Sequence, residues 1–206
     1  MTDDEEFATV DAEGNVVDTP ENVPDWDDEY LDRVSDRLMF NYDLERDHVV
    51  HGETFPMYGE LRIQRHKQFF HPAISYGHHE SFEHLFVATE PHPTVATFER
   101  LVDLGHDLAE EWVAADEEHY STEFIFCVVA DELPEEVRSF VSGFRDRTLL
   151  KYGYNGHYEI HLVCVAPDEE AVVGSKKTTL DRAFALWDPI DEPSGLLGKL
   201  KRRLLG

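Results

Sequence analysis

The chain has 206 residues, and 44 acidic against 18 basic residues give it a formal net charge of −26. This length is usual for one domain with short appendages. Hydrophobic residues make up 41% of the chain and aromatic residues 12%, which is enough for a core and excludes a fully disordered protein. The acidic excess also argues against nucleic acid as a partner of the main body, because such binding depends on Lys and Arg neutralising phosphates.

The distribution of charge indicates the solvent. Acidic residues are spread through the whole chain, as expected in molar salt, where the Debye length is roughly 3 Å and self-repulsion is suppressed. We therefore expect a halophilic protein. Residues 1–6 lack the basic and apolar stretch of an export signal, and the longest wholly apolar run, Phe124–Ala130, is too short to span a bilayer. A cytoplasmic location follows, with Cys127 and Cys164 as buried free thiols.

Composition divides the chain into three parts. Residues 1–25 are acidic, contain no Lys or Arg and have few hydrophobic residues, so we expect a disordered tail. Residues 26–190 carry regular hydrophobic patterns and are predicted to form one α+β domain. Residues 191–206 are predicted to form a linker and a basic amphipathic C-terminal helix.

The first half of the domain begins with a helical pattern and continues with strands. A helix is predicted over 26–40, with Asp25 as a possible cap, because hydrophobic residues recur at every fourth position. Alternation then predicts a strand over 53–63. Two more strands are expected at 68–76 and 82–89, joined by a short loop over 77–81.

The second half alternates helices with strands. Thr94 opens the clearest helical pattern, which ends near Ala115. Thr122–Ala130 is apolar on both faces and is predicted to be a central strand. The remaining predicted elements are a helix from 131 to about 144, a strand over 157–165 and a helix over 176–187. The expected fold is α+β, with helices packed on a mixed, mainly antiparallel sheet of about five strands.

The last 13 residues invert the composition of the chain, because they contain four bases and no acid. On a helix their leucines form one stripe and the bases lie beside or opposite it. The predicted docking residues are Leu196, Leu197, Lys199, Leu200, Lys201, Arg202, Arg203 and Leu204. Such a helix fits three targets: the acidic domain itself, a groove on an unknown partner protein, or the inner face of a membrane bound peripherally.

Histidines are frequent, and seven of the 12 lie between His48 and His84. On a strand, His157, Glu159 and His161 point to one face, while the residues between them point to the other. Two neighbours on that face could share zinc or another divalent metal, with a third ligand from His71 or His84 on an adjacent strand. The alternative is a polar strand face without a cofactor.

Other catalytic patterns are missing from the sequence. A nuclease site of the restriction-endonuclease type needs a lysine two residues after one of its acids, and Glu60, Glu83 and Glu123 have none at that offset. No serine nucleophile motif occurs, and neither cysteine has a basic neighbour that would activate it. These patterns therefore favour no enzyme class.

Three stretches carry a resemblance to a known family. They are Trp26–Leu31 continuing through Arg46, then Leu101–Phe124, then Phe144–Pro167. With them the chain resembles members of an uncharacterised haloarchaeal family, a domain of unknown function, over about residues 24–187. The resemblance implies a haloarchaeal cytoplasmic protein and implies no activity.

Two functional hypotheses follow. The first is a binding or adaptor protein without catalytic activity or cofactor, motivated by a well-patterned core and by terminal segments of opposite charge. The alternative is a metal-dependent hydrolase, with a nuclease-like enzyme as one version, that uses the strand histidines and Glu159.

Overall fold

The computed structural model describes residues 23–66, 78–114, 116 and 119–188. Their regular elements run in the following order along the chain: α1 (Glu29–Leu38), β1 (Asp43–Val50), β2 (Glu53–His66), β3 (His78–Thr89), α2 (Val95–Trp112), β4 (His119–Val129), α3 (Glu135–Gly143), β5 (Asp146–Leu149), η1 (Leu150–Gly153), β6 (His157–Ala166), η2 (Pro167–Glu169), β7 (Ala171–Gly174) and α4 (Asp181–Phe184).

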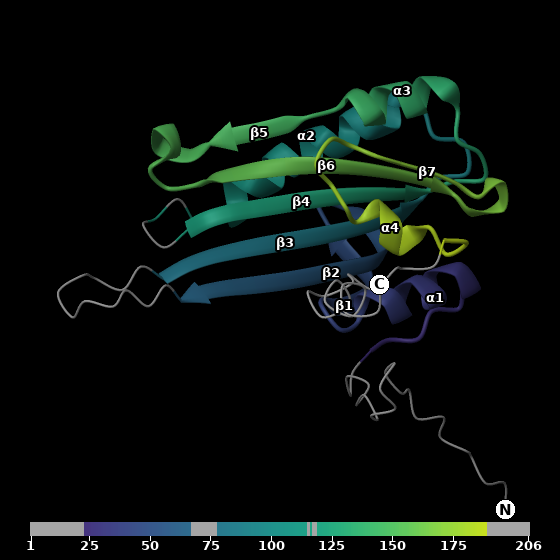
Figure 1. Cartoon of the computed structure of the whole chain (residues 1–206), viewed down its shortest axis with the longest axis horizontal. Coiled ribbons are helices and arrows are strands. Elements are labelled where there is room, and N and C mark those ends of the chain that lie inside the picture. The colour runs from purple at the N-terminus through teal and green to yellow at the C-terminus, as the bar shows by residue number, and fades with distance from the viewer. Residues whose placement is uncertain (1–22, 67–77, 115, 117–118, 189–206) are drawn as a thin grey trace, which may run out of the picture.

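One seven-stranded sheet organises the domain. Its strands lie in the order β1-β2-β3-β4-β6-β5, and β7 also pairs with β6. The β3–β4 and β4–β6 pairs are parallel and the other four pairs are antiparallel. Helices α2 and α3 lie on one face of the sheet, and α1 and α4 lie on the other (Figure 1). The predicted α+β class and the central position of the apolar strand, β4, are confirmed, with seven strands rather than about five.

The largest differences from the predicted elements lie at the sheet edges. Strands β1, β5 and β7 were not predicted, and the last helix is confined to Asp181–Phe184. Residues 78–81 belong to β3 rather than to a loop, while the predicted strand at 68–76 lies outside the described residues. Helix α1 starts three residues later than expected because the side chain of Asp28, not Asp25, caps it by accepting the N–H of Leu31.

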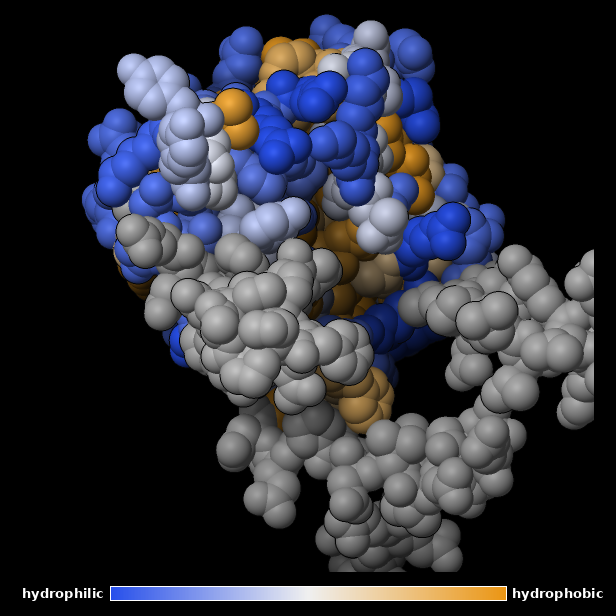
Figure 2. Space-filling view, turned by 60° about the vertical axis from the view of Figure 1, so that its left-hand side comes forward, coloured by the Kyte–Doolittle hydropathy of each residue, from blue (hydrophilic) through white to orange (hydrophobic). Residues whose placement is uncertain are grey.

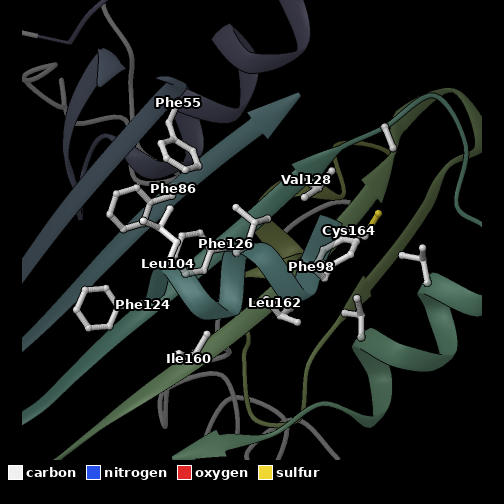
Figure 3. Close-up of a cluster of buried hydrophobic side chains, with 14 of the residues drawn as sticks. Phe55, Phe86, Phe98, Leu104, Phe124, Phe126, Val128, Ile160, Leu162 and Cys164 are labelled. Carbon is white, nitrogen blue, oxygen red and sulfur yellow. The ribbon is translucent and has the colours of Figure 1, made fainter. Parts of the chain in front are cut away.

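The core between the sheet and helices α2 and α3 is rich in phenylalanine. Phe86 and Phe126 stack with centroids 5.2 Å apart, and Phe55 meets the Phe86 ring edge-on at 5.1 Å. Figure 3 shows these rings on neighbouring strands, with α2 crossing above them. Aromatic pairs in these arrangements add about 0.5–1.5 kcal/mol each beyond their buried area, so the centre of the sheet is tightly fixed.

Helix α2 packs very closely on this core. It begins with a capping box, in which Thr94 and Thr97 bond reciprocally, as the predicted start at Thr94 requires. Gly105, in its middle, is buried, and a Cβ placed there would lie 3.0 Å from the side chains of Ile160 and Phe126. The glycine thus lets the helix axis approach β4 and β6.

The opposite face is covered by the N- and C-terminal parts of the domain. The indole N–H of Trp26 donates to the Pro56 carbonyl at 2.8 Å. Tyr30 donates to the Phe184 carbonyl at 2.6 Å, and the Arg37 guanidinium donates to four carbonyls between Arg182 and Asp188. The bonds of Tyr30 and Arg37 tie α1 to α4 and the residues after it, and the bond of Trp26 ties the segment before α1 to β2.

Other expectations concern cysteines and membrane segments. Cys127 and Cys164 are buried and free, as predicted. Within the described part of the chain, no helix is long and apolar enough to cross a membrane. The predicted tail covers residues 1–25, of which 1–22 lie outside the described residues, as does the predicted C-terminal helix with its docking residues. Val23 is described and packs, partly buried, on the core beneath α1 and α4.

Candidate functional site

A row of glutamates crosses the sheet on the face that carries α1 and α4. Glu83 of β3 is in register with Glu123 of β4, which is in register with Glu159 of β6. In a strand, side chains two residues apart share a face, so His157 and His161 lie on this face with Glu159. We call these five residues the glutamate cluster. The predicted common face of His157, Glu159 and His161 is therefore present.

Glu159 is the centre of the cluster. It is 7% exposed, and three cationic or imidazole nitrogens approach its Oε1: Arg147 Nε at 3.4 Å, His157 Nε2 at 3.5 Å and Lys177 Nζ at 3.6 Å. Its other oxygen, Oε2, lies 3.6 Å from His161 Nε2. Opposite charges around a buried carboxylate compensate the cost of removing it from water. The surroundings of Glu159 are thus those of an ion-paired carboxylate.

The two histidines of the cluster occupy different surroundings. The Arg147 guanidinium has only hydrogen-bond donors, so its N–H donates to His157 Nδ1, 3.3 Å away. In a neutral His157 the ring proton is therefore on Nε2, which faces Glu159. Burial, and then the nearby Arg147 charge, lower the pKa of His157. His161 is buried, and its Nε2 lies 3.4 Å from Glu123 Oε2.

The pKa values of the other two glutamates shift in opposite directions. The hydrogen bond with His161 lowers the pKa of Glu123 below its ordinary value. Burial raises the pKa of Glu83, although the Tyr42 hydroxyl donates to its Oε2 at 2.7 Å and opposes that shift. Neighbouring carboxylates with separated pKa values are one arrangement that acid–base chemistry uses, but ion-paired structural networks produce the same pattern.

The geometry does not complete the predicted metal site. Among the described residues, no group of three or more His, Cys, Asp or Glu side chains could hold a metal ion. Arg147 and Lys177 occupy the surroundings of the Glu159 oxygen that a metal would need. His84 lies on the opposite face, because it is one residue from Glu83 along β3. It therefore cannot be the third ligand, and His71 lies outside the described residues.

We expect Glu159→Gln to lower the free energy of unfolding by roughly 1–3 kcal/mol, because it removes the negative charge that the surrounding cations compensate. Urea denaturation at constant KCl concentration measures this change. The matched control is Glu136→Gln, at an exposed position on α3, which should alter stability by less than about 0.5 kcal/mol. Equal effects of the two substitutions would show that solvent already compensates the cations around Glu159.

The other face of the same end of the sheet carries a cleft of about 500 Å³. Five rings from four elements line it, and we call it the aromatic cleft: Tyr58 from β2, Phe82 and His84 from β3, Trp112 from the end of α2, and His119 from the start of β4. Its remaining lining residues are Glu60, Glu80, Val113, Ala114, Asp116 and Thr122.

Figure 2 shows this end of the molecule from the side of α1 and α4, with mainly hydrophilic residues at the described surface. The cleft on the other face, with its aromatic walls, belongs to a strongly acidic chain. Accessible apolar surface bordered by polar groups is typical of ligand sites.

His84 is the most constrained group of the aromatic cleft. Its ring lies parallel to that of Phe82 within 3° and meets Trp112 edge-on at 5.1 Å between centroids. Its Nδ1 lies 2.8 Å from the Tyr58 hydroxyl oxygen. Burial, and then the neighbouring His48, lower the pKa of His84 to about 4, so the imidazole is neutral at pH 7.

This shift predicts a pH dependence of stability. The pKa of His84 is about 4 in the folded protein and about 6.5 in an unfolded chain, so protons bind preferentially to the unfolded chain between these values. Stability is complete above about pH 6.5 and falls as the pH falls toward 4. Between pH 7 and pH 5 we expect the free energy of unfolding to fall by about 2 kcal/mol less in His84→Phe than in the unsubstituted protein. Urea denaturation at both pH values measures it, and equal losses in the two proteins would contradict the assignment.

His119, at the start of β4, is held by the protein at both ring nitrogens. Its Nδ1 lies 2.8 Å from the Asn155 carbonyl oxygen, and its Nε2 lies 2.9 Å from Thr122 Oγ1. Because carbonyl oxygen only accepts, Nδ1 carries a proton and donates. His119 therefore braces the wall of the cleft between β4 and the loop before β6.

Sequence reasoning did not find the aromatic cleft. A large apolar side chain on a helix predicts burial, yet Trp112 is 37% exposed at the rim of the cleft. Tyr58, on the polar face of the alternating β2 pattern, is buried beneath His48, whose ring stacks on it at 4.1 Å. The sequence does contain a signal for the cleft. Phe82 and His84 lie two residues apart and so share one face of a strand, and Trp112 is the last residue of α2.

Fold and site together define an α+β domain with a mixed sheet, an ion-paired cluster on one face and an aromatic cleft on the other. The chain belongs to the family described as Domain of unknown function (DUF8052), whose model matches residues 27–186. Searches of curated proteins and of solved structures gave no match. The resemblance to a domain of unknown function is thereby confirmed at the level of the family.

Proposed function

We propose that this is a non-catalytic binding protein that holds a small molecule in the aromatic cleft. The observation that carries the proposal is the cleft itself: about 500 Å³ of space walled by Tyr58, Phe82, His84 and Trp112. This volume lies within the roughly 300–1,000 Å³ of small-molecule sites, which combine mostly apolar walls with a few placed polar groups.

The state of the polar groups supports binding rather than hydrolysis. His84 is neutral at pH 7 and bonded to Tyr58 at Nδ1, and both nitrogens of His119 have partners in the protein. With a pKa of about 4, His84 is a weak proton acceptor at pH 7, and His119 has no ring nitrogen left for an attacking water. Rings that are fixed in this way favour a preformed binding site.

Binding of a neutral fluorescent probe, N-phenyl-1-naphthylamine, tests the proposal. We expect the full chain in 2 M KCl to bind one equivalent saturably, and Trp112→Ala to weaken binding at least 10-fold. Phe40→Ala, which removes a half-exposed ring outside the cleft, should leave the affinity unchanged. Absence of saturable binding, or equal effects of the two substitutions, would overturn the proposal.

We also propose a setting for this function, the salt-rich cytoplasm of a haloarchaeon. The net charge of −26 supports it, because screening by concentrated salt reduces repulsion among carboxylates. Unfolding free energies in 0.2 M and 2 M KCl test the proposal, since a halophilic protein is more stable at the higher concentration. A lower stability in 2 M KCl would contradict it.

The adaptor part of the proposal concerns residues 194–206, which lie outside the described residues. The basic, leucine-rich composition of this segment supports docking on the domain, on a partner protein or on the inner membrane face. Deleting it and fractionating cells at native salt tests this idea. Unchanged partners and an unchanged distribution between pellet and supernatant would contradict it.

The alternative, a metal-dependent hydrolase, is supported by one observation: His157, Glu159 and His161 share a face, with Glu123 3.4 Å from His161. The cations around Glu159 weigh against it. Metal analysis of untagged protein separates the two proposals. About one equivalent of zinc, manganese or iron would favour the hydrolase, and less than about 0.1 equivalent would end it.

A further inference from the structure

The walls of the aromatic cleft carry negative charge. Glu60, Glu80 and Asp116 line it, and none of the described lining residues is a lysine or an arginine. Glu80 is compensated by Arg62, whose Nη2 lies 2.6 Å from Glu80 Oε1. Asp116 accepts the backbone N–H of His119. The hydrogen-bond donor to Glu60 is a neutral group, the Tyr58 hydroxyl, 3.4 Å from Glu60 Oε2. An organic anion would therefore meet the carboxylate of Glu60 in this cleft.

The apolar part of the walls includes the rings of Tyr58, Phe82 and Trp112, beside Val113 and Ala114. The face of an aromatic ring attracts a cation that lies within about 6 Å of its centroid, and tryptophan does so most strongly. Phe82 already makes this contact within the protein, because the Arg62 guanidinium carbon lies 5.5 Å from its centroid. Tyr58 and Trp112 offer further rings to a cation inside the cleft.

His84 provides an independent indication of a ligand. It is 7% exposed, lines the cleft and uses Nδ1 in its contact with Tyr58. No described residue pairs with its Nε2. A buried polar atom without a partner is rare in folded proteins and calls for one. A polar group of a bound molecule at this position would satisfy the atom.

We propose that the aromatic cleft selects an organic ammonium cation that carries an apolar substituent. The ring faces of Tyr58 and Trp112 and the carboxylate of Glu60 would surround the charged group, and the substituent would fill the remaining apolar space. This inference rests on the proposed binding function and adds the charge of the ligand to it. The size of the cleft alone would admit a neutral or an anionic molecule equally well.

Three probes with the same phenyl group test the charge preference: protonated 2-phenylethylamine, neutral 2-phenylethanol and anionic phenylacetate. Calorimetric titration of the full chain in 2 M KCl gives their affinities, and at this salt concentration long-range attraction is screened. We expect the ammonium cation to bind at least 10-fold more tightly than the alcohol, and the anion to bind most weakly. Equal binding of cation and alcohol would overturn the inference while leaving the binding function intact.

Two substitutions assign the preference to residues. Glu60→Gln keeps the shape of the side chain and should reduce the ratio of cation to alcohol affinity at least 3-fold. Trp112→Leu keeps apolar bulk but removes the ring, and should reduce the same ratio. Glu136→Gln, on the exposed side of α3, should leave the ratio unchanged. A ratio that none of these substitutions alters would contradict the inference.

The possible failures can be told apart. If none of the three probes and no N-phenyl-1-naphthylamine binds, the binding function itself is wrong. If the neutral probe binds and phenylacetate binds more tightly than the ammonium cation, only the proposed charge of the ligand is wrong. Circular dichroism spectra of each variant show whether a lost affinity comes from a lost fold.

Discussion

Phe126→Ala should lower the free energy of unfolding by about 3–5 kcal/mol, the usual cost of truncating a phenylalanine inside a core. Phe126 is fully buried on the central strand β4. Its ring stacks on Phe86 and lies below Gly105 of α2, where a Cβ would come within 3.0 Å of it. Because α2 already packs closely on the sheet, neither element can move to fill the cavity that the missing ring leaves. The free-energy cost of this cavity therefore adds to the cost of losing buried apolar surface.

Urea denaturation at fixed KCl concentration measures this loss, with Phe40→Ala as the matched control. Phe40 follows α1 and is 49% exposed, so its truncation should cost less than about 1 kcal/mol. A loss below about 2 kcal/mol for Phe126→Ala would mean that α2 settles onto the sheet, which would contradict the tight packing at Gly105.

The long, patterned elements could be predicted from sequence. Helix α2 has a capping box at Thr94 and a continuous apolar stripe, and β4 is apolar on both faces because helices cover both sides of its middle. Such patterns arise from burial, which acts directly on residue type. The predictions for these two elements were accordingly confirmed.

The edge strands could not be predicted in the same way. In β1, exposed and half-buried residues alternate over Asp43–Val49, and charged residues such as Asp43, Glu45 and Arg46 are common. Strands β5 and β7 have only four residues each. Strands of this kind are held mainly by backbone hydrogen bonds to a neighbour. Hydrophobic and polar residue types therefore alternate little along these strands, and that alternation is what identifies a strand in a sequence.

Only those features of the candidate sites that arise within a single strand could be predicted from the sequence. The common face of His157, Glu159 and His161 follows from the period of a strand. The position of His84 does not, because it depends on how β3 is aligned with β4: the register pairs His84 with Phe124, and Glu83 with Glu123. The cleft needs β2, β3 and the end of α2 to meet, and that meeting is a property of tertiary structure.

The second large effect concerns the loop before β6, where Gly156 and Gly153 form a matched pair. Both have positive φ, +76° and +90°. A Cβ at Gly156 would overlap the Tyr120 carbonyl oxygen, whereas the nearest atom to a Cβ at Gly153 is 4.0 Å away. We expect Gly153→Ala to cost about 1 kcal/mol, the penalty of the backbone conformation alone. Gly156→Ala should cost about 3 kcal/mol or more, because the overlap adds to that penalty.

The difference between these two variants isolates the contact between the loop and β4. Gly156 precedes His157, which is in register with Ser121 of β4, and the neighbouring Asn155 carbonyl bonds to His119. A displaced loop should therefore also shift His119, a lining residue of the aromatic cleft, and weaken binding of N-phenyl-1-naphthylamine. Urea denaturation and the probe titration measure the two effects in the same proteins. Equal stabilities of the two variants would mean that β4 moves away from the loop without cost, and His119 would then not brace the cleft.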